Sequence, residues 1–373
     1  MKRAKIIIIG GGFAGLEAAK VLTCFKKKTE VILIDRKKQF NFLPMLPDVM
    51  GRLIKPEFLI YSIEDLSKRF GFTFLNREVR RVNLEENQLW VSQESINYDY
   101  LIIACGSETN FYGNKYVERN AYKLDHTLDA KNILAFLEKD MFDIYIIAGG
   151  GYTGIEIATS LRAYFNKIKK EKRIVIVERA PSLLGPLPEW MKRYVAGNLN
   201  RLNIEILLNT TIDTIEGNVI TTSKAHRFYK AVLIWSAGVK ISIFIHSLDI
   251  EKSSGGRLKV DEYLRVRDNC FVIGDAANFI YKDQPLRMAV QFSLAQGRCA
   301  AKNIINSINK GKLERYKPID LGYIIPMANN RSCGQIFNIN VKGLLATFLH
   351  YLMCVYRTIG FRNKIGIIKQ LIT

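Results

Sequence analysis

Cysteine is sparse and scattered in this 373-residue sequence, with its six cysteines at positions 24, 105, 270, 299, 333 and 354. No C-x-x-C pair occurs, and no zinc or iron–sulfur spacing can be found, so we expect no metal site. Enzymes that pass electrons through an adjacent dithiol need two cysteines close together in the chain, and that chemistry is excluded here. We expect six buried free thiols.

Long apolar runs are also missing. No stretch reaches the about 20 apolar residues that a membrane-spanning helix needs. The first residues, MKRAKIIII, resemble a signal peptide in having basic residues before an apolar run. The run leads into Gly10 without a small-residue cleavage site, so we interpret it as the first strand. The sequence therefore predicts a chain that is neither exported nor membrane-spanning.

Acidic residues are outnumbered. Lys and Arg total 55 against 35 Asp and Glu, which gives a net charge of +20 and a pI near 9.6. This excess suits an anionic partner, either lipid headgroups or nucleic acid, although a codon bias toward Lys would also produce it. With 48% hydrophobic residues the chain can bury a large core, and its length favours two or more domains.

One glycine pattern is present twice. IIIIGGGFAGLEAA at 6–19 and YIIAGGGYTGIEIA at 145–158 each place an apolar strand before G-x-G-x-x-G and a helix-forming run after it, as in a βαβ dinucleotide-binding unit. The first glycine permits the tight turn, the second lets the backbone approach a pyrophosphate, and the third lets helix and strand pack closely. These glycines are Gly10, Gly12 and Gly15 in the first copy, and Gly149, Gly151 and Gly154 in the second.

An acidic residue ends the strand after each glycine pattern, where its carboxylate can accept hydrogen bonds from ribose hydroxyls. VILID ends in Asp35, and RIVIVE ends in Glu178. Two complete sets predict two bound dinucleotides. A carboxylate at Glu178 would repel a 2′-phosphate and favours NADH over NADPH, a preference that the neighbouring Arg179 weakens.

Strand-like runs alternate with helical patterns along the chain, at 5–9, 31–34, 100–104, 144–148, 173–177, 231–235 and 270–273. The alternation predicts an α/β fold with two Rossmann-like domains and largely parallel sheets. CFVIGDAANF at 270–279 is a further nucleotide-type signal, so we expect one domain to be inserted in the other. Here Gly274 and Asp275 end a strand before an expected helix, where Asp275 either accepts from a flavin ribityl hydroxyl or caps the helix.

Together these features resemble the two-dinucleotide-fold flavoprotein superfamily and, more narrowly, the type II NADH:quinone oxidoreductases. The narrower resemblance rests on FNFLPMLPDVMG at 40–51, ACGSETNFYG at 104–113, MAVQFSLAQG at 288–297 and YRTIGFRNKIGI at 356–367. It implies a glutathione-reductase-like fold with FAD on the first glycine pattern and NADH on the second. The implied FAD domain comprises 1–110 and 257–325, the NADH domain comprises 111–256, and 326–373 forms an amphipathic membrane anchor.

The resemblance also implies roles for single residues. It assigns to FAD Gly10, Gly12, Gly15, Asp35, Gly106, Gly274 and Asp275, and to NADH Gly149, Gly151, Gly154 and Glu178. Glu156 matches a family residue between the nicotinamide and quinone regions, and Gln291 matches the first glutamine of the A-Q-x-x-x-Q quinone motif, so we expect both to be catalytic. The alternatives are a first-turn glutamate favoured by the helix dipole and a glutamine on a solvated helix face.

The sequence departs from the family at three positions. Val290 replaces the alanine of the quinone motif and Ala295 its second glutamine, so the quinone geometry is less secure than the cofactor sites. Cys105 stands where the family usually has threonine.

The tail GLLATFLHYLMCVY at 343–356 has no formally charged residue and is followed by Arg357, Arg362, Lys364 and Lys369. It is too short to span the bilayer, but it can lie in the bilayer surface while the cations meet anionic lipid headgroups. We expect a peripheral, monotopic protein on the cytoplasmic face of the cell membrane. A helix packed on the body of the protein, or a homodimer interface, is the alternative.

The sequence thus predicts a flavoenzyme that takes hydride from NADH onto FAD and reduces a quinone without pumping protons. A sulfide:quinone oxidoreductase shares the fold but needs two reactive cysteines at the flavin, and residues 144–163 contain none. A flavoprotein that binds nucleic acid fits the charge. However, the cations are scattered and no nucleic-acid module is recognised, so no specific nucleic acid is expected.

Overall fold

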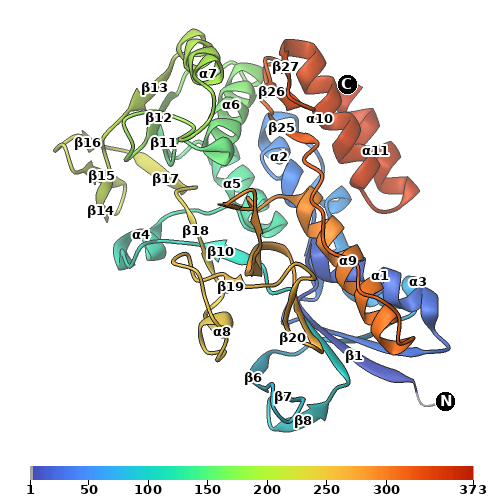
Figure 1. The fold of residues 1–373 in the computed structure, drawn as a ribbon. Coiled ribbons are helices and arrows are strands. Elements are labelled where there is room, and N and C mark those ends of the chain that lie inside the picture. Colours follow the sequence, from blue (N-terminus) through green and yellow to red (C-terminus); the bar gives the residue numbers. More distant parts are fainter. Residues whose placement is uncertain (1–2, 373) are drawn as a thin grey trace. The chain divides into compact units, whose positions relative to one another are not determined.

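The computed structural model describes residues 3–372, which fall into two compact units (Figure 1). Unit 1 takes the chain up to residue 40 together with 61–108 and 239–320. Unit 2 takes 41–60, 109–238 and the chain from 321 onward. Each unit is therefore assembled from three separate stretches of sequence.

Unit 1 is built around a six-stranded sheet in the order β20-β21-β9-β1-β2-β5. The strands from β21 to β5 run parallel, and β20 is antiparallel to β21. The isoleucines of β1 are almost inaccessible to solvent, as expected for a parallel strand that is covered on both faces. The strands are β1 (Ala4–Ile9), β2 (Thr29–Ile34), β5 (Thr73–Leu75), β9 (Tyr100–Ile103), β20 (Arg265–Arg267) and β21 (Cys270–Val272).

Helices α1 (Phe13–Leu22) and α9 (Val290–Ile308) pack against each other in unit 1. A Cβ added to Gly297 would lie 2.5 Å from the carbonyl oxygen of Ala14, so this approach requires glycine. The remaining elements of unit 1 are η1 (Thr23–Phe25), α3 (Ile63–Phe70), β6 (Val79–Asn83), β7 (Gln88–Val91), β8 (Glu94–Asn97), α8 (Ile243–His246), β19 (Leu258–Lys259), η4 (Gly274–Ala276), β22 (Ala277–Asn278), β23 (Ile280–Tyr281) and β24 (Gln284–Pro285).

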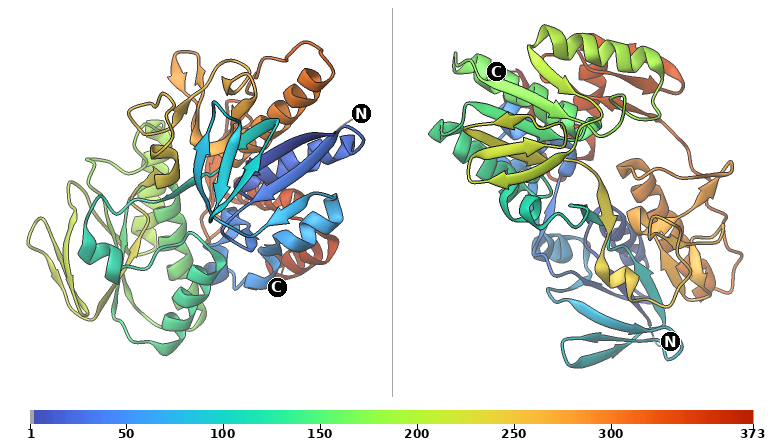
Figure 2. Two further views of the ribbon diagram at one scale, coloured as in Figure 1. Left: turned by 90° about the horizontal axis from the view of Figure 1, so that it is seen from below. Right: turned by 90° about the vertical axis from the view of Figure 1, so that its left-hand side faces the viewer.

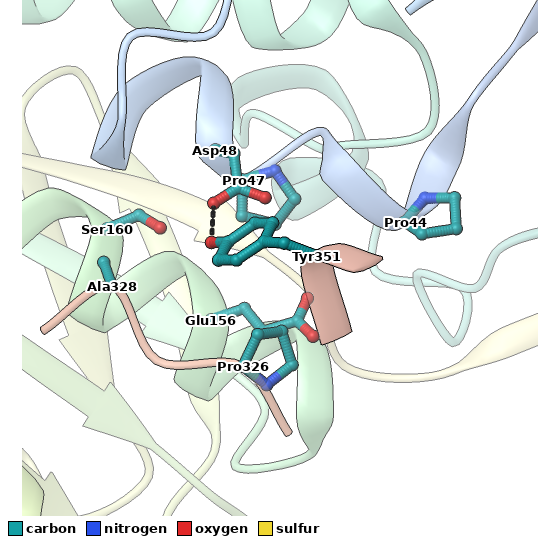
Figure 3. A pocket seen from close by; sticks show the side chains of 8 residues that line it. All are labelled: Pro44, Pro47, Asp48, Glu156, Ser160, Pro326, Ala328 and Tyr351. Carbon is teal, nitrogen blue, oxygen red and sulfur yellow. Dashed lines mark hydrogen bonds between the residues drawn. The ribbon is translucent and has the colours of Figure 1, made fainter. Parts of the chain in front are cut away.

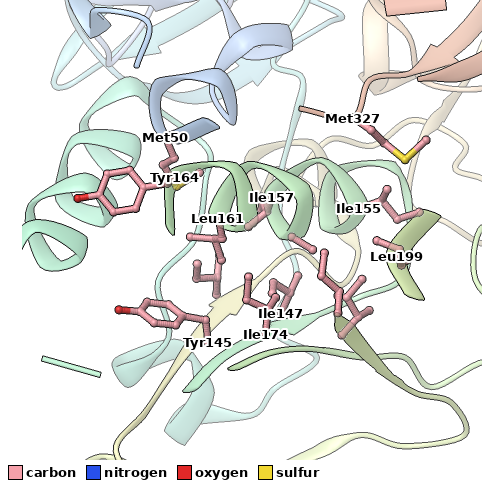
Figure 4. Close-up of a cluster of buried hydrophobic side chains, with 14 of the residues drawn as sticks. Met50, Tyr145, Ile147, Ile155, Ile157, Leu161, Tyr164, Ile174, Leu199 and Met327 are labelled. Carbon is pink, nitrogen blue, oxygen red and sulfur yellow. The ribbon is translucent and has the colours of Figure 1, made fainter. Parts of the chain in front are cut away.

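Unit 2 contains a four-stranded parallel sheet in the order β13-β12-β11-β17. Helix α6 (Tyr152–Lys167) covers one face of it, and Figure 4 shows Ile157 and Leu161 of α6 packed over Ile147 and Ile174 of the strands. The other elements here are η2 (Leu43–Met45), α2 (Asp48–Gly51), η3 (Pro56–Phe58), α4 (Lys115–Asn120), α5 (Thr127–Lys139), β11 (Ile144–Ala148), β12 (Arg173–Val177), α7 (Glu189–Arg201), β13 (Ile204–Leu207), β14 (Ile212–Glu216), β15 (Val219–Thr222), β16 (Arg227–Phe228) and β17 (Ala231–Trp235).

The C-terminal part of unit 2 is an antiparallel sheet followed by two helices, namely β25 (Gly322–Ile325), β26 (Cys333–Ile336), β27 (Ile339–Lys342), α10 (Gly343–Arg357) and α11 (Phe361–Ile372). Strand β26 packs against α7, and the red strands lie beside this lime-green helix in Figure 2. Helix α11 packs on η3, because a Cβ on Gly366 would lie 2.4 Å from Cζ of Phe58. Gln370 Nε2 also donates to the carbonyl oxygen of Leu53 at 3.2 Å.

Short strands lie where the chain passes from one unit to the other, namely β3 (Gln39–Asn41), β4 (Ile60–Ser62), β10 (Ser107–Thr109) and β18 (Val239–Ile241). All seven strands predicted from the sequence are present, and the α/β fold with parallel sheets is confirmed. The structural units differ from the predicted functional domains, since 41–60 and the segment from 321 onward group with the second nucleotide fold. The functional boundaries stay predictions.

Candidate functional site

The first glycine loop joins β1 to α1 in unit 1. Gly10 has φ of 108°, which only glycine adopts easily, and a Cβ on Gly15 would lie 1.9 Å from the carbonyl oxygen of Gly10. Gly12 is the N-cap of α1, and a Cβ there would meet no atom of the described chain within 4 Å. The loop is therefore closed at Gly15 and open at Gly12, where a pyrophosphate could approach the helix N-terminus.

The second glycine loop, between β11 and α6 in unit 2, repeats this geometry. Gly149 has φ of 106°, and a Cβ on Gly154 would lie 1.9 Å from the Gly149 carbonyl oxygen. Gly151 is the N-cap of α6, and an added Cβ meets nothing within 4 Å among residues 3–372. Both loops thus have the open second glycine that a bound dinucleotide requires.

The two predicted acids also behave alike. Asp35 Oδ2 accepts the backbone N–H of Gly11 at 2.6 Å, and Glu178 Oε2 accepts that of Gly150 at 2.6 Å. Each carboxylate therefore holds the middle of its own glycine loop. A carboxylate has about four acceptor sites, so these bonds leave room for ribose hydroxyls at the same oxygens.

Asp275 lies in unit 1 and accepts a hydrogen bond from Ser107 Oγ at 2.7 Å. Burial raises the pKa of Asp275, against the lowering effects of Ser107 and Arg257. The prediction that a helix follows Asp275 directly is wrong. Gly274–Ala276 forms one 3-10 turn, three short strands follow, and α9 begins only at Val290, because Phe279–Tyr281 favours extended structure and Pro285 interrupts a helix.

Gln296 is a residue that the sequence argument missed. It is 2% exposed, and its Oε1 accepts the backbone N–H of Gly274 at 2.7 Å, so it fixes the turn that carries Asp275. The turn has an unusual backbone at Gly274, with φ of 70°. The signal was in the sequence, since Gln296 directly follows Ala295 in the altered glutamine motif.

Gln291 lies in the first turn of α9 in unit 1 and is partly buried. Its Nε2 donates to Asp320 Oδ1 at 3.1 Å, and Asp320 is also paired with Arg287 at 2.8 Å. The alternative of a glutamine on a solvated helix face describes Gln291 only in part, because its amide donates to the carboxylate of Asp320. Its expected role in quinone reduction remains a prediction.

Glu156 lies in the second turn of α6, so it is not the first-turn glutamate of the alternative reading. It lines a small cavity in unit 2 with Asp48 and Tyr351, and Pro44, Pro47, Ser160, Pro326 and Ala328 complete the lining (Figure 3). Burial and the nearby charge of Asp48 raise the pKa of Glu156 well above its ordinary value. A glutamate in this setting can hold a proton at neutral pH.

Asp48 and Tyr351 were not predicted as site residues. Asp48 is 6% exposed, and its Oδ1 accepts a hydrogen bond from the Tyr351 hydroxyl at 2.6 Å. Burial raises the pKa of Asp48 to about 6, although the Tyr351 hydroxyl and the Arg52 guanidinium both favour its charged form. The structure thus brings together Glu156, Asp48 and Tyr351 from three distant parts of the chain.

All six cysteines are free, and Cys270, Cys333 and Cys354 are buried. The prediction of six buried thiols is wrong for Cys24, which is exposed, and incomplete for Cys105 and Cys299, which are partly buried. Burial raises the pKa of Cys105, Cys270 and Cys333 to about 12, so these thiols resist forming the reactive thiolate. Among residues 3–372, no cluster of His, Cys, Asp and Glu could hold a metal ion.

The C-terminal helices are apolar on two sides. Thr347, Tyr351 and Cys354 of α10 are buried, while the opposite side of the tail is exposed. We call the exposed set the tail face, and it consists of Leu344, Leu345, Phe348, Leu352, Met353, Tyr356, Phe361, Ile365, Ile368 and Ile372. Over the residues described, no helix has the length and apolar character needed to cross a bilayer.

Known proteins share this architecture over nearly the whole chain. A type II NADH:quinone oxidoreductase of Staphylococcus aureus strain bovine RF122 / ET3-1 is 24% identical over 375 residues, which cover 93% of each chain. The structure of NDH2 from Plasmodium falciparum in complex with NADH superposes with a TM-score of 0.86 at 20% identity, over 100% of this chain and 98% of that one.

A third comparison is with the sulfide:quinone oxidoreductase of the hyperthermophilic bacterium Aquifex aeolicus. It has a TM-score of 0.81 at 19% identity and covers 97% of this chain and 92% of that one. The two solved structures show the shared fold, and the named relatives bear out the resemblance seen in the sequence.

The decisive match is to the family described as pyridine nucleotide-disulphide oxidoreductase, which extends over residues 4–300. This range includes both glycine loops, both acids, Glu156 and Asp275. The chain therefore belongs to the pyridine nucleotide-disulphide oxidoreductase family.

Proposed function

We propose that the protein is an FAD-dependent NADH:quinone oxidoreductase, a type II NADH dehydrogenase that works at a membrane surface. One observation carries this proposal. Each unit has a glycine loop that is open at its second glycine and is held by an acid from the next strand, at 2.6 Å in both cases. Two such loops in one chain suit one dinucleotide in each unit.

The FAD site belongs to unit 1. Gly12 and the N-terminus of α1 would face the pyrophosphate, Asp35 would accept from a ribose, and Asp275 would accept from the ribityl chain. Gly106, with φ of 69° and open space where a Cβ would be, permits a close approach of the backbone after β9. When bound, the flavin accepts a hydride and passes on two electrons.

The NADH site belongs to unit 2. Gly151 and the N-terminus of α6 would face the pyrophosphate, and Glu178 would accept from the adenosine ribose. Arg179 lies near the ring of Tyr112, with its guanidinium carbon 5.9 Å from the ring centroid. The carboxylate of Glu178 would repel a 2′-phosphate, which supports the preference for NADH over NADPH.

Quinone is the proposed acceptor. Reduction of a quinone consumes two electrons and two protons, so a group that holds a proton near the ring is useful. Burial and the charge of Asp48 raise the pKa of Glu156 well above its ordinary value, which favours its protonated form, and the Gln291 amide can act as a polar contact for a quinone oxygen. Gln291 is the first glutamine of the quinone motif, whose alanine is replaced by Val290. The second glutamine of the motif is replaced by Ala295, and Gln296 directly follows it.

The tail face supports attachment to an anionic membrane surface. Its exposed apolar side chains cover two successive helices, and Arg362 and Lys369 are exposed on α11 among them. Apolar side chains with neighbouring cations suit the boundary between acyl chains and anionic headgroups. With a net charge of +20, the whole chain favours this partner, and we place it on the cytoplasmic face as a peripheral protein. The alternative is a homodimer, in which a second copy of the chain covers the tail face.

A sulfide:quinone oxidoreductase is the second candidate, because the Aquifex aeolicus enzyme has a similar fold. That chemistry needs a pair of reactive thiols. In unit 2 the two cysteines, Cys333 and Cys354, are both buried, and burial raises the pKa of each thiol. The free cysteines therefore favour the NADH enzyme.

Anaerobic stopped-flow spectroscopy of the purified holoprotein tests the proposal. NADH should bleach the visible absorbance of the oxidised flavin, and a water-soluble quinone added next should restore it within the same experiment. Bleaching that quinone does not reverse would contradict the acceptor. Bleaching by sulfide but not by NADH would establish the sulfur enzyme instead.

A further inference from the structure

The Tyr351 hydroxyl joins an arginine to an aspartate inside unit 2. Arg52 Nε lies 2.6 Å from the hydroxyl oxygen, and Asp48 Oδ1 lies 2.6 Å from it on the other side. Because a guanidinium can only donate, the tyrosine oxygen accepts from Arg52 and its single proton must point to Asp48. Asp48 Oδ1 is therefore an acceptor, which favours the charged carboxylate.

A close contact between two helices brings Asp48 to Glu156. A Cβ on Gly51 of α2 would lie 2.7 Å from Ser160 Oγ and 2.9 Å from Ser160 Cα, so glycine lets α2 pack directly on α6. Ser160 is one turn beyond Glu156 on the same helix. The cavity that both carboxyl groups line has a volume of about 10 Å³ for the centre of a water molecule, which is room for about one water.

The two carboxyl groups have unequal surroundings. Asp48 Oδ1 accepts a hydrogen bond from the Tyr351 hydroxyl and lies 3.7 Å from Arg52 Nε. Glu156, in contrast, is affected by burial and by the negative charge of Asp48, both of which favour its protonated form. Figure 3 draws the Tyr351 ring between these two side chains.

The other helices add little charge to this pair. Helix α10 also carries His350, Cys354, Tyr356 and Arg357, and none of them contributes to the pKa of either carboxyl group. Burial and both carboxyl groups raise the pKa of the Cys354 thiol, whereas burial, Arg52 and Arg357 lower the pKa of His350 to about 4, so both side chains favour their uncharged forms at neutral pH. Helix α5, which also packs on α2, contributes to neither carboxyl pKa.

We propose that Asp48, held by Tyr351 of α10 and by Arg52, is a positioning residue that keeps the proton of this carboxyl pair on Glu156. The final use of that proton rests on the proposed function. NADH supplies two electrons and one proton as hydride, and Glu156 supplies the second proton when its O–H bond breaks and an O–H bond forms on the quinone. Water then returns a proton to Glu156, so NADH, one proton and quinone give NAD⁺ and hydroquinone.

Infrared titration of the oxidised holoprotein locates the proton without any turnover. Protonated carboxyl groups have a C=O stretch that is separate from that of carboxylates, and the variants Asp48→Asn and Glu156→Gln assign the bands. Tyr351→Phe removes only the hydroxyl. Tyr229→Phe makes the same change at a tyrosine that is 61% exposed, and it is the matched control.

The wild-type protein should lose one protonated-carboxyl band near pH 6 and keep a second band to higher pH. The first should be absent in Asp48→Asn and the second in Glu156→Gln. In Asp48→Asn the Glu156 band should titrate about one pH unit or more lower, because a neighbouring negative charge is gone. In Tyr351→Phe the Asp48 band should persist to higher pH by a similar amount, and Tyr229→Phe should match the wild type.

An unchanged Glu156 titration in a folded, flavin-containing Asp48→Asn protein would overturn the inference. Asp48→Asn keeps a side-chain oxygen that can accept the hydrogen bond from the Tyr351 hydroxyl. It therefore tests the effect of Asp48 on Glu156 even when Tyr351→Phe does not fold. The stopped-flow traces separate the two proposals. If the bands move as expected but quinone does not reoxidise the flavin, the proton assignment stands and the acceptor is wrong.

Discussion

A Cβ on Gly154 would lie 1.9 Å from the carbonyl oxygen of Gly149, and the same distance separates the corresponding positions of Gly15 and Gly10. The third glycine of each loop thus packs on the first. The second glycines, Gly12 and Gly151, have φ near −80° and no such neighbour in the described chain. One motif therefore contains glycines needed for packing and glycines needed for the approach of a ligand.

Alanine substitutions should separate these two roles in unit 2. Gly154→Ala should lower the free energy of unfolding by about 1–3 kcal/mol, the usual cost of overpacking. Gly151→Ala should leave stability nearly unchanged and raise the KM for NADH about tenfold, equivalent to about 1.4 kcal/mol of binding. Urea denaturation and steady-state kinetics measure the two effects. Equal loss of stability in both variants would contradict the distinction.

Glu178→Gln should change the choice between the two nicotinamide cofactors. Glutamine keeps one acceptor oxygen, so one of the bonds to the N–H groups of Gly150 and Ala180 is lost, and the ribose loses its charged acceptor. We expect the KM for NADH to rise about tenfold and the KM for NADPH to rise less. Glu171→Gln, an exposed control in the same unit, should change neither value. Equal increases for both cofactors would show that Glu178 only holds the loop.

Asp48→Asn should stabilise the protein in a pH-dependent way. Burial raises the folded pKa of Asp48 from its ordinary value of 3.8 to about 6, so the folded state binds the proton more tightly than the unfolded state. Wild-type stability should therefore fall as pH rises from about 4 through 6, by about 3 kcal/mol in total.

The variant lacks this titration, so its advantage should be small at pH 4 and approach about 3 kcal/mol at pH 7. Urea midpoints at the two pH values measure it. Asp65→Asn, at an exposed position of α3, is the control and should follow the wild type. Parallel curves for the wild type and Asp48→Asn would contradict the assignment of the raised pKa.

Phe348→Glu should weaken attachment to membranes. Phe348 is 60% exposed at the tail face, and a carboxylate there would oppose both insertion and contact with anionic headgroups. Flotation with vesicles containing anionic lipid should show about a tenfold loss of binding, whereas the rate of flavin reduction by NADH should be unchanged.

Met141→Glu, at a position that is 57% exposed between α5 and β11 of unit 2, is the matched control and should float like the wild type. A change from dimer to monomer in Phe348→Glu with full vesicle binding would assign the tail face to a homodimer. Substitution is preferable to deletion of the tail, because α10 also contributes the buried Ala346, Tyr351 and Cys354.

The sequence predicts the nucleotide-binding frame well because that frame is local. Strand, glycines and helix follow one another within 14 residues in each copy, so the backbone geometry at Gly10 and Gly149 could be anticipated from the pattern. The acids Asp35 and Glu178 directly follow the next strand of each sheet, where the parallel register of β1 with β2 and of β11 with β12 brings them back to the loop.

The carboxyl pair could not be predicted in this way. Asp48 and Tyr351 are 303 positions apart, and their contact depends on the packing of α2, α6 and α10, which no local pattern encodes. The tail was predicted only in part. Its apolar run predicts a surface helix or a packed helix, and α10 has both properties, because Tyr351 is buried while Phe348 is exposed.

Unit 2 has a consequence for how the chain folds during synthesis. Its first segment, 41–60, is made early, but Tyr351 and Gln370, which bond to Asp48 and Leu53, follow 303 and 317 residues later. Unit 1 also needs its third segment, 239–320, before its sheet has β20 and β21. Apolar residues of 41–60 such as Met45, Leu46 and Val49 are buried in the folded unit but stay exposed until α5 and α6 have been made and pack on α2. Exposed apolar surface of this kind makes a nascent chain prone to aggregation.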